Sequence, residues 1–177
     1  GTAASADETD VKIFGYEPGD ARAAACFVRV YDEAHLKAHP QQNVTTMTML
    51  VDGEPDDAGR YYALSLGVTF RGSDSQMRAS GGCGATADGV ELISCGIDCD
   101  AGTIGLRFRD AGSILVDIPD GARTWDPDAP EDEEEFVDTV GRFGPDDKVF
   151  RLDRADPSQC VSLSYDDALT ALLTKGH

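Results

Sequence analysis

The sequence predicts a mainly-β domain in which about eight antiparallel strands follow one another as a meander and close into a barrel, with a two-sheet sandwich as the alternative. Two observations carry this prediction. Short segments with a hydrophobic period of two recur every ten to fifteen residues or so, and turn dipeptides separate them. Asp-Ala-Gly begins at 57, 100 and 110, and Asp-Gly begins at 52, 88 and 120. Aspartate can cap its own turn, and glycine adopts the positive φ that a tight hairpin needs.

The most regular strand pattern is YYALSLGVTFR at 61–71, where every second residue from Leu64 to Phe70 is large and apolar. The residues between them are small or polar, which indicates one buried and one solvated face, as is typical of antiparallel sheets. Closing such a sheet removes its exposed edges, and about eight strands suffice for a small barrel. The remaining strands are expected at 22–31, 43–51, 76–80, 90–95, 103–109, 113–118 and 147–153, with a last short pairing at Val161 and Leu163.

Two short helices are expected beside the strands. Residues 32–39 form a polar stretch that begins with an aspartate and ends before Pro40, whose ring and missing N–H stop a helix. Near the C-terminus, Ser164 and Asp167 form a capping-box pattern that precedes a leucine-lined face. This pattern predicts a helix at about 164–175 that lies across the sheet.

The length of 177 residues fits one domain, which we expect to span 11–177. Residues 1–10 are small and polar, so they are expected to lie outside the fold as a disordered tail, either a mature N-terminus or a scar of tag removal. The 15 Lys and Arg are outnumbered by 33 Asp and Glu, for a net charge of -18. This charge argues against nucleic acid partners and against membrane surfaces, and no apolar run has the length of a membrane helix.

Three of the five cysteines lie among glycines in the stretch 80–110. We predict structural disulfides among Cys83, Cys95, Cys99 and Cys160, and of the three possible connectivities we favour Cys83 with Cys95 and Cys99 with Cys160. Each bond would contribute on the order of 3 to 4 kcal/mol in the chain-entropy model. Cys26, on an apolar strand face, is expected to be a buried free thiol. The spacing lacks the CxxC pairs and histidines of zinc sites, so it indicates an oxidising compartment, periplasmic or extracellular.

Metal and cofactor sites are not predicted. His35 and His39 stand one helical turn apart, and Asp126, Asp128 and Glu131 belong to a carboxylate-rich run, so these five are the weak metal candidates. The favoured interpretation is a surface turn for the histidines and a solvated loop for the carboxylates. The calcium-loop pattern that begins at residue 98 fails, because its twelfth position is arginine.

No catalytic motif is present. The sequence lacks the GxSxG elbow, the GxxxxGK[ST] phosphate loop and a GxGxxG after a strand, so we expect a protein that is not an enzyme and has no cofactor. The first functional hypothesis is a barrel that binds a small apolar ligand in its interior, although the same side chains could simply fill that interior. The candidate lining residues are Leu64, Leu66, Val68, Phe70, Ile104, Leu106, Phe108, Ile114 and Val116. The alternative is an acidic interaction module or inhibitor that captures a basic exported protein.

Two stretches resemble a known group of proteins. The run from Cys95 into Cys99-Asp-Ala-Gly and the segment DDKVFRLDRADPSQC at 146–160 are similar to uncharacterised exported, periplasmic proteins of proteobacteria with a small β-barrel. The resemblance implies export and a small β domain. It carries over no function and no catalytic residue.

Overall fold

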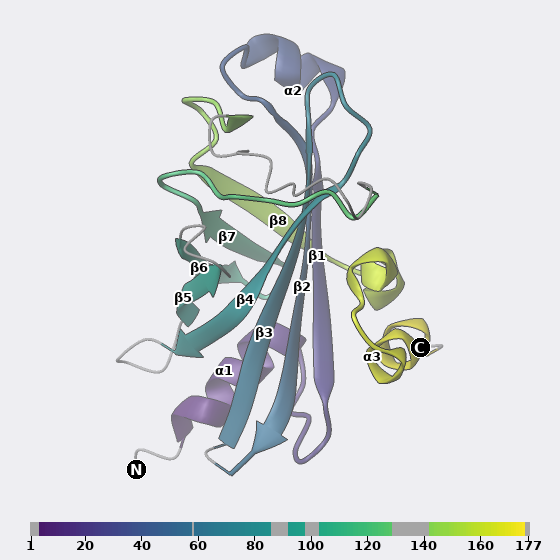
Figure 1. Ribbon diagram of the computed structural model, residues 1–177. Helices are drawn as coiled ribbons and strands as arrows, with labels where there is room; N and C mark the ends of the chain where they lie inside the picture. The colour runs from purple at the N-terminus through teal and green to yellow at the C-terminus, as the bar shows by residue number, and fades with distance from the viewer. Residues whose placement is uncertain (1–3, 58, 86–91, 98–102, 129–141, 176–177) are drawn as a thin grey trace.

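The computed structural model describes residues 4–57, 59–85, 92–97, 103–128 and 142–175, with the backbone alone at 4–7, 85, 92–97 and 103. An antiparallel sheet curls around one core, a helix lies at one end of it, and the C-terminal segment packs on its outer face (Figure 1). The strands are β1 (Ala23–Val30), β2 (Val44–Asp56), β3 (Gly59–Phe70), β4 (Met77–Ala85), β5 (Leu92–Ile97), β6 (Thr103–Asp110), β7 (Ser113–Asp117) and β8 (Val149–Ala155).

The sheet is a meander in which each strand pairs antiparallel with the next one in the sequence. β8 pairs back to β1, where Cys26–Val28 lie opposite Asp153–Ala155, so the strand order returns to its start. The prediction of a mainly-β antiparallel fold with a short C-terminal helix is confirmed.

The longest hairpin, β2 and β3, extends beyond the predicted strands. The predicted strands end at residue 51 and begin again at residue 61, but Gly53–Asp56 pair with Gly59–Tyr62. Two residues therefore connect the strands, which a tight hairpin allows. β4 likewise continues past the predicted end at residue 80, because its glycine-rich second half pairs with β5.

Helix α1 (Ala4–Phe14) corrects, for residues 4–10, the expectation that residues 1–10 are a tail outside the fold; residues 1–3 lie outside the described part of the chain. Asp10 is buried, and Ile13 and Phe14 belong to the core. Asp10 accepts hydrogen bonds from the Tyr62 hydroxyl and from Arg60 Nε, the latter at 3.1 Å. These two β3 side chains stabilise a buried carboxylate that would otherwise be costly, so the helix stays attached to one end of the sheet.

Helix α2 (Glu33–Ala38) confirms the short helix predicted at 32–39. The Asp32 carboxylate accepts a hydrogen bond from the backbone N–H of His35 at 2.7 Å and thereby caps the helix.

The C-terminal segment differs from its prediction at two points. The pairing expected at Val161 and Leu163 is wrong, because Pro157–Leu163 form the 3₁₀ helix η3. Helix α3 (Asp167–Thr174) begins later than predicted, since Asp166 and not Ser164 is its N-cap and accepts a hydrogen bond from Leu169 N.

The buried apolar residues form two clusters, one on each face of β1 and β2. The larger cluster fills the inside of the curled sheet. The smaller cluster lies between the outer face and the segment η3–α3, and it consists of Cys26, Leu50, Cys160, Leu163, Leu169 and Leu173. Each fully buried leucine contributes about 1.5 to 3 kcal/mol, so this cluster holds the C-terminal segment against the sheet.

Candidate functional site: an aromatic groove on the outer face

A groove of about 400 Å³ lies outside the sheet, between the outer faces of β3 and β4, the connection between η3 and α3, and the segment around Trp125. Its lining consists of Tyr61, Ala63, Leu64, Ser65, Leu66, Arg78, Ala79, Ser80, Gly81, Gly82, Trp125, Leu163, Ser164 and Tyr165.

Three large aromatic side chains are partly exposed in this groove. Tyr61 is 56% exposed, Trp125 42% and Tyr165 57%. They come from three distant parts of the sequence, so the fold and not local sequence brings them together. Amphipathic aromatic rings that stay accessible offer large contact areas and polar tips, which is why they are frequent at binding surfaces.

The floor of the groove is made of small residues. Ala63 in β3 lies opposite Gly82 in β4. A Cβ atom added at Gly82 would come within 2.5 Å of the Tyr61 hydroxyl oxygen, so the glycine leaves room for the Tyr61 ring beside the strand. The Tyr61 ring therefore lies over Gly82, while the other outer-face residues here, Ala63 and Ser80, are small.

Trp125 is positioned by the edge of β4. Its backbone N–H donates to the Arg78 carbonyl at 2.9 Å, and the Arg78 N–H donates to the Trp125 carbonyl at 2.8 Å. This two-bond bridge extends the sheet by one residue and fixes the tryptophan next to Arg78.

Tyr165 forms another wall and is fixed by a charged network of Arg22, just before β1, Asp52 in β2 and Asp166 at the start of α3. Its hydroxyl donates to Asp52 at 2.6 Å, and Arg22 donates to the same carboxylate at 2.7 Å and to Asp166 at 3.1 Å. Asp52 is only 2% exposed, so these donors compensate the cost of burying its charge.

The pKa values of this network follow from its geometry. The ring of Tyr165 is largely exposed, but its hydroxyl end is shielded from water beside Asp52, and both the burial and the hydrogen bond to Asp52 raise the pKa of Tyr165. Burial lowers the pKa of Arg22, but the hydrogen bonds to Asp52 and Asp166 and the charge of Asp52 outweigh it, so the net shift is upward. Both groups therefore keep their protons at neutral pH.

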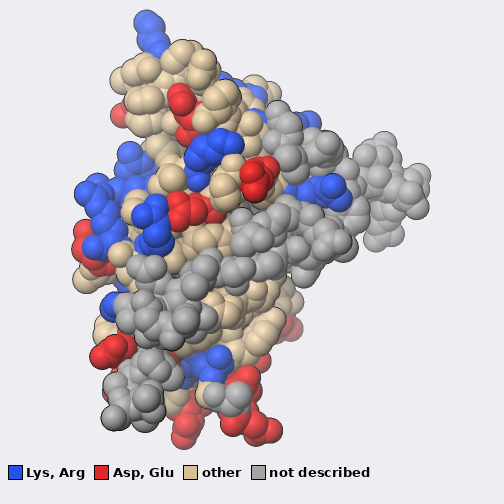
Figure 2. Space-filling model, turned by 90° about the vertical axis from the view of Figure 1, so that its left-hand side faces the viewer, with Lys and Arg blue, Asp and Glu red and all other residues tan. Residues whose placement is uncertain are grey.

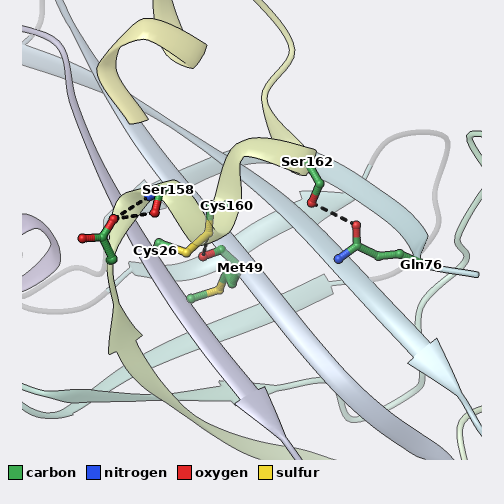
Figure 3. The surroundings of a disulfide bond; sticks show 7 residues. Cys26, Met49, Gln76, Ser158, Cys160 and Ser162 are labelled. Atoms are coloured by element: carbon green, nitrogen blue, oxygen red, sulfur yellow. Dashed lines mark hydrogen bonds between the residues drawn. A yellow bond between two sulfur atoms is a disulfide. The ribbon is translucent and has the colours of Figure 1, made fainter. Parts of the chain in front are cut away.

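A disulfide between Cys26 in β1 and Cys160 in η3 fixes the same segment to the sheet (Figure 3). The two Cα atoms lie 5.8 Å apart, and Sγ of Cys160 is 3.4 Å from the carbonyl oxygen of Met49. Further along η3, the Ser162 hydroxyl donates to Gln76 Oε1 at 3.2 Å (Figure 3).

This disulfide corrects two predictions. Cys26 is not a free thiol, and Cys160 is not paired with Cys99. Alternation correctly placed Cys26 on a buried face of β1. That face, however, is the outer one, which becomes buried only because η3 and α3 cover it.

No family model, curated protein or solved structure matches the chain. The groove, together with the disulfide, the Asp52 network and the Trp125 bridge that hold its walls, is therefore the candidate functional site. Among the described residues, no helix combines the length and apolar character needed to cross a membrane.

The cysteines of the glycine-rich stretch are described only in part. Cys83 is disulfide-bonded, and the β4–β5 register places Cys95 directly opposite it. The side chain of Cys95 and the whole of Cys99 lie outside the described residues. The pairing of Cys83 with Cys95 stays a prediction.

The weak metal candidates have other partners where the structure describes them. The imidazole rings of His35 and His39 stack with their centroids 4.1 Å apart. Nε2 of His35 lies 2.9 Å from Gln42 Oε1, and Nδ1 of His39 lies 2.8 Å from the backbone carbonyl oxygen of His35. Asp126 accepts a hydrogen bond from the backbone N–H of Asp128. Glu131 lies outside the described residues. Within the part of the chain that the structure describes, no three His, Cys, Asp or Glu side chains are grouped to hold a metal ion.

The nine residues predicted to line an interior site belong to the packed core. Eight of them are at most 2% exposed and belong to one cluster, against which Phe108 packs half-buried. The sequence argument thus identified the inner face of the sheet correctly but placed the ligand site inside it. Leu64 and Leu66 also belong to the lining of the outer groove, but its three aromatic residues were missed, because an exposed aromatic on the polar face of a strand gives no periodic signal. The one available indication was the single tryptophan beside a turn-rich segment.

Proposed function

We propose that this protein is an exported, non-enzymatic β-barrel protein that binds a small ligand with an apolar, ring-shaped body in the outer groove. The observation that carries the proposal is the convergence of three partly exposed aromatic side chains, Tyr61, Trp125 and Tyr165, on one groove with a floor of small residues. Stacking on such rings adds to the gain from burying apolar surface.

The size of the groove supports a small molecule as its occupant. Small-molecule sites in proteins have volumes of about 300 to 1,000 Å³, and a volume of about 400 Å³ lies toward the lower end of that range. The walls are fixed in advance by the disulfide, the Asp52 network and the Trp125 bridge. Preformed walls reduce the entropy that binding would otherwise cost.

Export is supported by the Cys26–Cys160 disulfide. Such bonds persist in the periplasm and outside the cell, and they are rare in reducing compartments. The barrel is supported by the strand order that returns from β8 to β1.

The acidic interaction module is the less favoured function. Figure 2 shows Lys and Arg side chains lying among Asp and Glu on the described part of one face. On that face a basic partner would meet both signs of charge, which weakens the steering that a uniform acidic surface would provide.

Intrinsic fluorescence provides a direct test, because Trp125 is the single tryptophan of the chain and lies in the groove. Ring-bearing small molecules such as phenyl, indole and pyranoside derivatives would be titrated against the folded protein. We expect a shift or quenching of the Trp125 emission with at least one class, and about tenfold weaker binding for Tyr61→Ala and Tyr165→Ala.

The matched control is Tyr16→Ala, since Tyr16 is a comparably exposed tyrosine outside the groove. Its affinity should equal that of the wild type. Equal affinities for all three tyrosine variants, or no response to any of these classes, would refute the proposed function.

A further inference from the structure

Arg78 is a cation in the wall of the aromatic groove. Its Nη1 donates to the carbonyl oxygen of Ser162, and its Nε is buried without a hydrogen-bond partner among the described residues. No described Asp or Glu lies within ion-pair distance of its guanidinium.

Arg22 and Arg29 share with Arg78 a buried Nε without a hydrogen-bond partner among the described residues, but three buried or half-buried arginines other than Arg78 have more partners for their guanidinium groups. Arg22 pairs with Asp52 and Asp166, and Arg60 pairs with Asp10. Arg154 donates to three backbone carbonyls. Two of them belong to the last turn of helix α1 and the third to the turn between β6 and β7. Arg78 differs from these arginines because its guanidinium group has no described carboxylate partner and donates to one described backbone carbonyl.

The surroundings of Arg78 leave it charged but poorly compensated. Burial lowers the pKa of Arg78, and the charge of Asp128 opposes this effect. An arginine stays protonated in proteins, so the guanidinium carries its positive charge into the groove. A partly buried donor without a partner is unfavourable, and an anionic group that enters the groove would relieve this cost.

We propose that the groove selects small monocarboxylates that carry a ring, with the carboxylate paired to Arg78 and the ring packed beside Trp125. This inference rests on the proposed function and narrows it to one ligand class. The guanidinium and the tryptophan are neighbours, because their backbones are joined by the two hydrogen bonds of the bridge. A ligand with a short linker between ring and carboxylate would contact both.

A carboxylate is the favoured anion because its two oxygens match the planar guanidinium, which forms charge-assisted hydrogen bonds with it. The repulsion between ligand and protein that the net charge of -18 creates would be offset only where a cation is available. In this groove Arg78 is that cation, since it is the only Lys or Arg among the described lining residues.

The test compares two ligands of nearly the same shape, the anionic 3-phenylpropionate and the neutral 3-phenylpropionamide, by titration of Trp125 fluorescence. We expect the wild-type protein to bind the acid about tenfold to hundredfold more tightly than the amide. Added salt should weaken binding of the acid more than that of the amide. Arg78→Gln should abolish the preference, and Arg78→Lys should retain part of it.

Arg151→Gln is the matched control, because Arg151 is an exposed β8 arginine outside the groove that pairs with Asp153. It should keep the wild-type preference. Circular dichroism and thermal unfolding would establish that each variant is folded, and Arg78→Lys keeps the test valid if Arg78→Gln does not fold.

The outcomes separate this inference from the proposed function. Equal binding of acid and amide, or a preference that survives in Arg78→Gln, would overturn the role of Arg78 while the groove remains a binding site. Failure of both phenyl compounds to bind would overturn the inference, and the wider ring panel would then decide on the groove. Octanoate that binds as tightly as 3-phenylpropionate would support carboxylate recognition by Arg78 but contradict the preference for a ring.

Discussion

The hydroxyl group of Tyr165 donates a hydrogen bond of 2.6 Å to the buried carboxylate of Asp52, 113 residues away in the sequence. This bond connects the groove wall to the second strand of the sheet. The same tyrosine thus presents its ring to the groove and its polar end to a charged network that the fold needs.

Tyr165→Phe should destabilise the protein by about 1 to 2 kcal/mol, because the buried carboxylate of Asp52 loses one donor but keeps Arg22. Urea unfolding followed by circular dichroism would measure this difference. Tyr61→Phe also keeps its ring and is the control, with an expected change within about 0.5 kcal/mol. Equal free energies of unfolding for both variants would contradict a structural contribution of the Tyr165 hydroxyl.

The stability of the protein at alkaline pH should depend on the same hydrogen bond between Tyr165 and Asp52. The folded-state pKa of Tyr165 is raised above its unfolded value of about 10. A raised pKa means that the stabilisation is complete below pH 10 or so and is lost as the pH rises toward the folded-state pKa. The free energy of unfolding should therefore fall more steeply above about pH 10 in the wild type than in Tyr165→Phe. Parallel curves would argue against the raised pKa.

Acid pH should act on the N-cap of α3. The backbone N–H of Leu169, followed by Arg22, lowers the pKa of Asp166 below its ordinary value. A lowered carboxyl pKa stabilises the fold above the unfolded value of about 3.9, and this contribution disappears as the pH falls through the folded-state pKa. Asp166→Ser keeps a capping oxygen without a charge, so it should show a weaker loss of stability below about pH 4. An acid profile identical to that of the wild type would contradict this assignment.

The strands could be predicted because their cause is local. Leu64, Leu66 and Val68 alternate with small or polar residues, and a period of two places them on one buried face whatever the rest of the chain does. The helix capped by Asp32 is equally local, since its carboxylate accepts a hydrogen bond from the N–H of His35, three positions along the chain.

The elements that were missed depend on distant partners. Helix α1 has a short apolar stretch, and it is ordered by Arg60 and Tyr62 of β3. Cys26 pairs with a cysteine 134 residues away, and spacing cannot show which face of β1 that partner covers. Tyr61, Trp125 and Tyr165 likewise become a site only after the C-terminal segment has packed on β3.

Gly144→Ala should be strongly destabilising, by roughly 2 kcal/mol or more. An added Cβ would lie 2.0 Å from the backbone oxygen of Gln41, which cannot move freely. The shift would also disturb the buried carboxylate of Asp147, which accepts hydrogen bonds from the backbone N–H groups of Gly144 at 2.7 Å and of Asn43 at 2.8 Å. Gly84→Ala is the control, because no atom of the described residues lies within 4 Å of its Cβ position. A similar unfolding midpoint for both variants would show that the loop at Gly144 can relax.

Removing the disulfide should cost about 2 to 5 kcal/mol, because it closes a long loop and fixes η3 to β1. Cys26→Ala, Cys160→Ala and the double variant should lose similar amounts, since all three remove the same bond and their effects are not additive. Emission of Trp125 should report a looser groove in each variant, because Leu163 at the end of η3 and Tyr165 just after it line the wall. Peptide mapping without reduction should recover Cys26 joined to Cys160, and Cys160 joined to Cys99 would contradict the assignment. Additive losses in the double variant would show that each cysteine contributes by its own packing and not through one shared bond.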